Sequence, residues 1–180
     1  MIKYLLSRLA HYHMVGDERV PNVIDDVNSI ITELRQDLKS TNSIVYVASE
    51  ANNYDEVDAH SQLLFASLKL SGLIFHNYYV LDDRNKARAK ELIENASLIF
   101  LSGGDTYTQN LLFNDLNLKE YLKNFNGVVL GQSAGAMNMA ENVFSAPEEI
   151  VWAKPTKFTG LGLTNINIEP HFVFGENPND

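Results

Sequence analysis

The sequence contains no cysteine, which excludes disulfide bonds, cysteine nucleophiles and cysteine-based metal sites. It is also short of positive charge, because 14 lysine and arginine residues face 23 aspartate and glutamate residues, for a net charge of −9. This balance argues against a surface that binds nucleic acid or an anionic membrane. Such a composition is typical of a cytoplasmic protein, and we expect that location.

Long apolar runs are missing too. No stretch approaches the roughly 18 apolar residues that a membrane helix needs. The N-terminus has one basic residue, Lys3, but lacks the apolar core of a signal peptide. No repeat, low-complexity segment or linker is present, so we expect one soluble domain over residues 1–180 with a single hydrophobic core.

Apolar segments suited to buried strands alternate with segments of helical spacing. We expect strands at 2–6, 43–48, 73–81, 96–101 and 127–130, and helices at 21–38, 59–70, 85–95, 106–116 and 118–125. This alternation predicts an α/β fold of three layers, with a mainly parallel sheet covered by helices on both faces. The strands at 43–48, 96–101 and 127–130 should be central neighbours. Beyond Met139, short segments at 143–144, 150–152 and 163–168 predict an antiparallel excursion.

The most informative stretch is Gly131-Gln132-Ser133-Ala134-Gly135, which lies between a predicted strand and a predicted helix. Gly-x-Ser-x-Gly in that context indicates a nucleophile elbow, in which small residues at −2 and +2 let the backbone turn and raise the serine hydroxyl above the sheet. The N–H of Ala134 would then point toward an oxyanion formed on the substrate. A glycine-rich turn with an idle serine is the alternative. A serine nucleophile needs a base from elsewhere in the chain.

A second motif, Ser102-Gly103-Gly104-Asp105-Thr106, follows another predicted strand. Its glycines would let the backbone approach a bound group and direct an N–H toward it. The equally weighted alternative is a tight turn in which Asp105 caps the next helix. The spacing fits neither a phosphate loop nor a dinucleotide fingerprint.

Histidines are the candidate bases. We expect a strand to end at Asn167-Ile168-Glu169-Pro170-His171-Phe172, which would bring His171 to the same rim of the sheet as Ser133. Direct proton transfer would then require the Ser133 hydroxyl and a His171 ring nitrogen to lie within about 3.5 Å. The pair His11 and His13 is expected in a solvated loop rather than at a metal, because no third ligand lies nearby in the sequence.

Taken together and in this order, the motifs at 103–106, 131–136 and 168–172 resemble the peptidase E (aspartyl dipeptidase) and cyanophycinase family of serine peptidases. The resemblance covers nearly the whole chain. It implies a fold like the class I glutamine amidotransferase domain (flavodoxin-like), a small peptide as substrate, and no metal or cofactor. It also implies Ser133 as nucleophile and His171 as general base, with Gly104 and Ala134 as oxyanion donors.

The substrate site implied by the resemblance also includes Gly103, Asp105 and Gln132. The family usually has Gly-Gly-Gly-Asn where this chain has Ser102-Gly103-Gly104-Asp105, and aspartyl dipeptidases have tryptophan at the place of Gln132. The extra carboxylate of Asp105 predicts poor acceptance of acidic side chains.

The acid that orients the histidine has several candidates. Glu148 lies where the family sometimes places it, and Glu176 and Asp180 are candidates beyond His171. The family normally continues further, so we expect a chain shortened at its C-terminus.

The sequence therefore predicts a serine-type, dipeptidase-like peptidase. An esterase of the α/β-hydrolase type shares the elbow, but its histidine normally lies much later in the chain. A family-shaped binding protein without turnover is the second alternative. The sequence leaves the choice between monomer and homodimer open.

Overall fold

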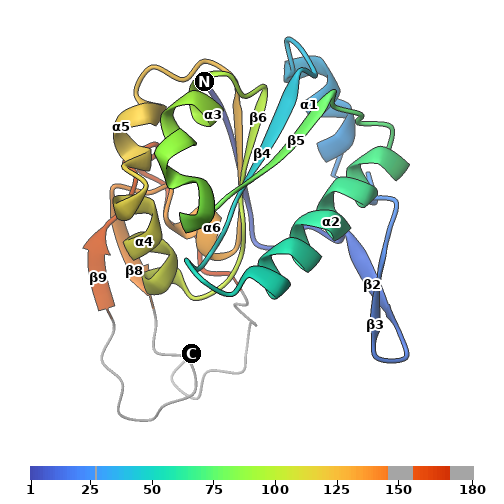
Figure 1. Ribbon diagram of the computed structural model, residues 1–180, viewed down its shortest axis with the longest axis horizontal. Coiled ribbons are helices and arrows are strands. Elements are labelled where there is room, and N and C mark those ends of the chain that lie inside the picture. Colours follow the sequence, from blue (N-terminus) through green and yellow to red (C-terminus); the bar gives the residue numbers. More distant parts are fainter. Residues whose placement is uncertain (27, 146–155, 171–180) are drawn as a thin grey trace.

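The computed structural model of the chain describes residues 1–26, 28–145 and 156–170. Five strands form the central sheet in the order β1 (Ile2–Leu6), β7 (Val128–Gln132), β6 (Leu98–Leu101), β4 (Ser43–Val47) and β5 (Asn77–Leu81). All four pairings between them are parallel (Figure 1). The prediction that β4, β6 and β7 are central neighbours is confirmed.

Helices connect these strands. They are α1 (Ile30–Asp37), α2 (Tyr54–Leu70), the 3-10 helix η1 (Asp83–Arg88), α3 (Ala89–Glu94), α4 (Thr106–Asp115), α5 (Leu118–Leu122) and α6 (Ala134–Met137). The chain moves along the sheet in one direction from β1 to β5 and returns through β6 and β7. Right-handed crossovers then place α1 and α2 on one face and α3, α4 and α5 on the other, as Figure 1 shows. Within the described residues, none of these helices has the length and apolar character needed to cross a bilayer.

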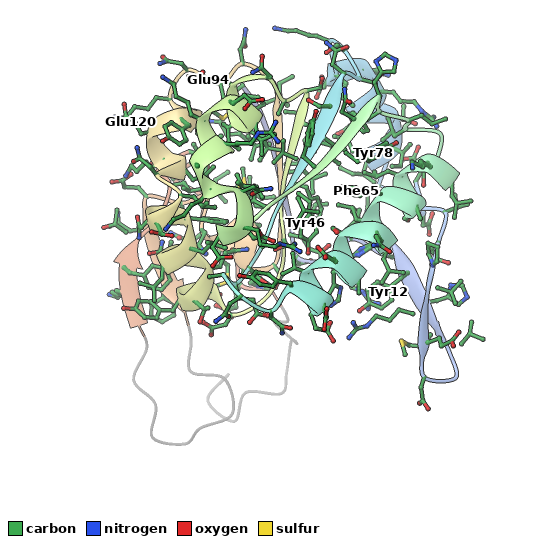
Figure 2. The ribbon with its side chains drawn as sticks, viewed as in Figure 1. Tyr12, Tyr46, Phe65, Tyr78, Glu94 and Glu120 are labelled. Carbon is green, nitrogen blue, oxygen red and sulfur yellow. The ribbon has the colours of Figure 1, made fainter. Side chains whose placement is uncertain are left out.

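Side chains from the sheet and from α2 build the core. Every residue of β4 and β6 is buried, as expected for parallel strands covered on both faces. Phe65 of α2 packs edge-on against Tyr46 of β4 and at a tilt against Tyr78 of β5, with ring centroids 6.3 and 5.0 Å apart (Figure 2). Aromatic pairs at such separations stabilise a fold beyond the area they bury, so α2 is firmly seated over β4 and β5.

The strand order also contains a topological switch point, between β4 and β6. The chain leaves β4 toward one face of the sheet and leaves β6 toward the other, and these two strands are neighbours. Loops that depart in opposite directions open a space at the carboxyl ends of the strands, where α/β proteins place their ligands. The glycine motif follows β6, and Ser133 follows the adjacent strand β7.

The region between β1 and β4 differs from the prediction. Residues around His13 form no loop but an antiparallel hairpin of β2 (Tyr12–Val15) and β3 (Glu18–Pro21), which projects beside α2 in Figure 1. The helix predicted from Pro21 begins only at Ile30, because Pro21 instead pairs with Tyr12 at the end of β3. The carboxylate of Asp26 accepts the N–H of Ile31 at 2.7 Å, so it fixes the start of the shorter helix. His11 is buried at the base of the hairpin, and burial lowers the pKa of its ring.

Two other predicted elements differ from the expectation. The strand expected at 73–81 covers only β5, which leaves His76 outside it, and the helix expected at 85–95 is divided between η1 and α3. An antiparallel pair, β8 (Asn142–Ser145) with β9 (Thr156–Thr159), does follow α6.

The strand expected at 163–168 is wrong, and so is the described part of the strand expected to lead into His171. Residues 163–170 contribute only an isolated bridge, at Thr164. The backbone N–H groups of Leu161 and Leu163 instead bond to the carbonyls of Asn138 and Met139, at the end of α6.

Candidate functional site

The turn between β7 and α6 holds Ser133 in an unusual backbone conformation. Its φ is 50° and its ψ is −117°, in the positive-φ region that side chains with a Cβ avoid. Such a conformation costs about 1–3 kcal/mol and persists only when the surroundings impose it. Here the N–H of Ser133 donates to the carbonyl of Leu6 at 2.8 Å, and the carbonyl of Ser133 accepts from Met137 at 3.0 Å. Strand β1 and helix α6 therefore fix the turn from both sides.

The two glycines of the motif are required by packing. A Cβ on Gly131 would lie 2.7 Å from the backbone nitrogen of Ala136, and a Cβ on Gly135 would overlap the carbonyl of Leu101. Real Cβ atoms do not approach backbone atoms so closely. The first turn of α6 can therefore lie against β7 and β6 only because both positions lack a side chain.

The glycine motif after β6 passes directly beside Ser133. A Cβ on Gly103 would lie 3.4 Å from the Cβ of Ser133. Gly104 has a φ of 150°, and a Cβ there would lie 2.6 Å from the Cβ of Ser49. Ser49 follows β4, so the loops after β7, β6 and β4 meet in one continuous rim. Nothing in the sequence motifs pointed to Ser49.

Asp105 is a helix cap. Its carboxylate accepts the backbone N–H of Thr108 at 2.7 Å, at the N-terminus of α4, and its side chain is exposed. The capping alternative of the sequence analysis is confirmed. The negative charge of Asp105 nevertheless stays at the rim, one residue beyond Gly104.

Gln132 carries an unsatisfied acceptor. It ends β7, and the atom nearest to Gly103 after Ser133 is its side-chain nitrogen, at 3.6 Å from a Cβ built on that glycine. The side-chain oxygen of Gln132 is buried and accepts no hydrogen bond from the described part of the chain. A buried acceptor without a donor costs about 1–3 kcal/mol, so this position favours a group that brings an N–H.

Two further polar groups hold the rim of the sheet. Asp82, fully buried at the end of β5, accepts from Arg84 at 2.6 Å, and the same guanidinium donates to Asp58 of α2 at 2.6 Å. The hydrogen bonds from Arg84 lower the pKa of Asp58.

On the other side, the buried amides of Gln109, Asn110 and Asn138 form a connected group, here called the amide cluster. The sequence analysis missed both features, although Gln109-Asn110 interrupts an otherwise apolar helical spacing.

His171 and Glu148 lie outside the described residues, as do Glu176 and Asp180. The separation of about 3.5 Å between Ser133 and His171 thus stays a prediction. The described site residues, from the loops after β6 and β7, do come together at one edge of the sheet.

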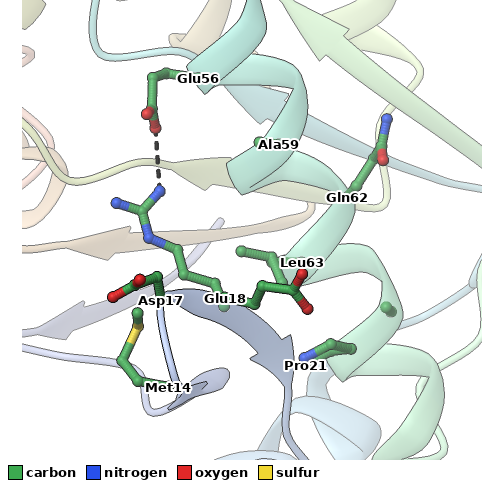
Figure 3. A pocket seen from close by; sticks show the side chains of 10 residues that line it. Met14, Asp17, Glu18, Pro21, Glu56, Ala59, Gln62 and Leu63 are labelled. Carbon is green, nitrogen blue, oxygen red and sulfur yellow. Dashed lines mark hydrogen bonds and ion pairs between the residues drawn. The ribbon is translucent and has the colours of Figure 1, made fainter.

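A hollow lies away from this edge. A pocket of 720 Å³ separates the β2–β3 hairpin from α2, with Met14, Pro21 and Leu63 among its walls. Arg19 of β3 forms an ion pair with Glu56 of α2 at 3.1 Å, which is the dashed line that ends at Glu56 in Figure 3. None of the predicted site residues that the structure describes lines it.

The packing of Gly135 can be tested. In Gly135→Ala the new Cβ must push α6 away from Leu101, which moves the Ser133 turn. We expect the melting temperature to fall and the rate of labelling by a fluorophosphonate to fall at least about tenfold. Gly16→Ala is the control. Its positive φ of 60° strains an alanine, so this variant also loses stability, but Gly16 has open space around it and the new Cβ meets no neighbour. That variant should lose roughly 1–2 kcal/mol of stability and label normally. Equal labelling of both variants would contradict the steric argument.

Comparisons with known proteins identify the family of the chain. A family model described as Peptidase family S51 matches residues 19–180. A comparison with curated proteins finds no match.

Two solved structures share the fold. One is a peptidase from an acI-B1 Actinobacterium (18% identity, TM-score 0.59), of which the alignment covers 62%, together with 80% of this chain. The other is a putative peptidase E protein from Listeria monocytogenes EGD-e (14% identity, TM-score 0.54). The alignment covers 70% of that protein and 76% of this chain. The chain thus spans less than two thirds of the first of these. Since the family model matches all but the first 18 residues, the chain belongs to peptidase family S51 and is peptidase E-like.

Proposed function

We propose that this protein is a serine peptidase that hydrolyses small peptides, in the manner of a dipeptidase. The observation that carries the proposal is the backbone of Ser133, whose positive φ at a strand-to-helix turn is the geometry that raises a nucleophile above a sheet. Membership of a peptidase family supports peptide bonds as the target.

The chemistry follows from the arrangement of the rim. His171 takes the proton of the Ser133 hydroxyl while the serine oxygen attacks the carbonyl carbon of the peptide. The N–H groups of Gly104 and Ala134 hold the resulting oxyanion. His171 then gives its proton to the departing amine, which leaves an ester between the acyl group and Ser133. Water attacks this ester with His171 again as base, and the acid product is released as the serine recovers its proton.

Each part has a different energetic role. An oxyanion donor is worth about 10²–10³ in rate, because it is already oriented before charge develops. The packing of Gly104 against Ser49, and of α6 against β7, supports such an orientation of the Gly104 and Ala134 N–H groups before the reaction. Gln132 would accept an N–H of the substrate with its unsatisfied side-chain oxygen, and Gly103 leaves room for the substrate beside Ser133.

The wider assignments belong to the same proposal. The five-stranded parallel sheet is compatible with a class I glutamine amidotransferase-like fold, with serine in the place of that group's cysteine. A single domain, a cytoplasmic location and a small-peptide substrate without nucleic-acid binding fit the net charge of −9 and the absence of cysteine.

The decisive test is covalent labelling. A fluorophosphonate should label the wild-type protein at one site, and both labelling and dipeptide hydrolysis should vanish in Ser133→Ala, because no other group can carry the acyl chain. Mass spectrometry of the labelled protein reads the site. Hydrolysis of simple esters without peptides would indicate an esterase, and labelling without any turnover would indicate a binding protein. Retained hydrolysis in Ser133→Ala would refute the proposal.

The orienting acid is tested separately. If Glu148 holds the His171 tautomer, Glu148→Gln should cut kcat by up to about 10⁴-fold while thermal unfolding stays unchanged. Glu176→Gln is the matched control, with the same loss of one charge. An unchanged kcat in Glu148→Gln would exclude Glu148, and a loss confined to Glu176→Gln would assign the role there.

Asp105 allows charge and capping to be separated. Asn caps a helix as well as Asp does, so Asp105→Asn should leave stability within about 0.5 kcal/mol of the wild type. Because the carboxylate no longer repels an acidic substrate, kcat/KM for Asp-Xaa dipeptides should rise, whereas that for Ala-Xaa dipeptides should not. The idea fails if the unmodified protein already cleaves Asp-Xaa as efficiently as Ala-Xaa.

A further inference from the structure

The amide cluster touches the backbone on both sides of the glycine motif. Gln109 of α4 donates from its side-chain nitrogen to the carbonyl of Ser102 at 2.7 Å. Asn138, directly after α6, donates to the carbonyl of Thr106 at 2.9 Å. Ser102 and Thr106 flank Gly103, Gly104 and Asp105, so two buried amides hold the two ends of this loop.

The same amides connect the loop to the Ser133 turn. The Asn138 side chain also donates to the Gln109 side-chain oxygen at 3.1 Å, which joins the two anchors. The backbone N–H of Asn138 bonds to the carbonyl of Ala134 at 2.9 Å. Ala134 follows Ser133, so the distance between the proposed oxyanion donors of Gly104 and Ala134 is set through Asn138.

The orientation of Asn138 is itself determined. Both of its side-chain donors are used, and its side-chain oxygen accepts from Asn110 at 3.0 Å. Asn110 also donates to the carbonyl of Thr159 in β9, at 3.0 Å. Asn138 and Gln109 are fully buried, and a buried amide with its partners in place has one favourable orientation.

We infer that Gln109 and Asn138 are positioning residues for the proposed oxyanion hole, which keep the Gly104 N–H in register with that of Ala134. This inference rests on the proposed function. An apolar pair could join α4 to α6 equally well, but it would leave the carbonyls of Ser102 and Thr106 without these donors. A loop that shifts by less than 1 Å keeps its fold and loses transition-state stabilisation, since oxyanion donors act at short range.

The test compares Gln109→Leu and Asn138→Asp with two controls. Gln109→Leu keeps approximate volume and removes the donor to Ser102, and Asn138→Asp removes the donors to Thr106 and Gln109. Asn114→Ala is the first control, because the Asn114 side chain donates to Asn110, on the far side of the amide cluster from the glycine motif. Leu64→Ala is the second, because Leu64 is fully buried in α2 and its loss destabilises the core without touching the rim.

Three quantities are measured for each variant: kcat and KM for a dipeptide, the inhibition constant of a dipeptide aldehyde, and the fluorophosphonate labelling rate. Bound aldehyde places a negative oxygen in the oxyanion hole, so it reports the positioning directly. In Gln109→Leu and Asn138→Asp, the two rim variants, we expect kcat to fall about 10- to 100-fold with KM within about threefold of the wild type. Aldehyde affinity and labelling should fall by similar factors. Both controls should keep all three quantities within about threefold below their melting temperatures.

The outcomes distinguish a failure of the positioning role from a failure of the proposed function. Rim variants that lose stability as Leu64→Ala does, yet keep kcat, aldehyde affinity and labelling, would overturn the positioning role. If Gln109→Leu does not fold, Gln109→Met serves in its place, since a thioether has no hydrogen to donate to Ser102. A wild-type protein that is not labelled at Ser133 overturns the proposed function itself, and this inference with it.

Discussion

The positive φ of Ser133 is the constraint on which the site depends. A residue with a Cβ leaves this conformation unless neighbouring atoms forbid the alternatives. The carbonyl of Leu6 holds its N–H, Met137 holds its carbonyl, and the packing of Gly131 and Gly135 allows α6 to begin at once after β7. Removing any of these contacts would let the backbone of Ser133 relax. The strained conformation therefore depends on the pairing of β1 with β7 and on the two glycines together.

Apolar packing stabilises the central sheet, and side-chain hydrogen bonds stabilise the loops at its edge. Strands β4, β6 and β7 are buried and supply the stable platform. The loops at their carboxyl ends contain small residues and have little apolar surface to pack, so side-chain hydrogen bonds hold them. Arg84 holds the loop after β5 by bonding to Asp82 and Asp58. Gln109 and Asn138 hold the loop after β6.

Sequence reasoning succeeded where one physical signal dominated. Continuous apolar runs predicted the central strands. The motif at 131–135 predicted the turn, because a side chain at Gly131 or Gly135 would clash with neighbouring backbone atoms. It failed where a distant partner decided the outcome. Pro21 looks like a helix start, but pairing with Tyr12 makes it the end of a strand. Residues near Leu163 have the composition of a strand, but Asn138 and Met139 at the end of α6 take their hydrogen bonds. The contacts of Gln109 with Ser102, and of Ser49 with Gly104, join segments whose proximity no local pattern encodes.

The pairing of β1 with β7 has a consequence for how the protein is made. Ile2 pairs with Val128 and Leu6 with Gln132, so β1 leaves the ribosome long before its partner β7. Until residue 132 emerges, β1 must wait with its backbone groups unpaired, in a state that is prone to edge-to-edge association. Contacts so far apart in sequence also slow folding, because a long loop must close before they form. The N–H of Ser133 reaches its acceptor, the carbonyl of Leu6, only once β1 and β7 are side by side, so the strained turn at Ser133 forms together with this long-range pairing.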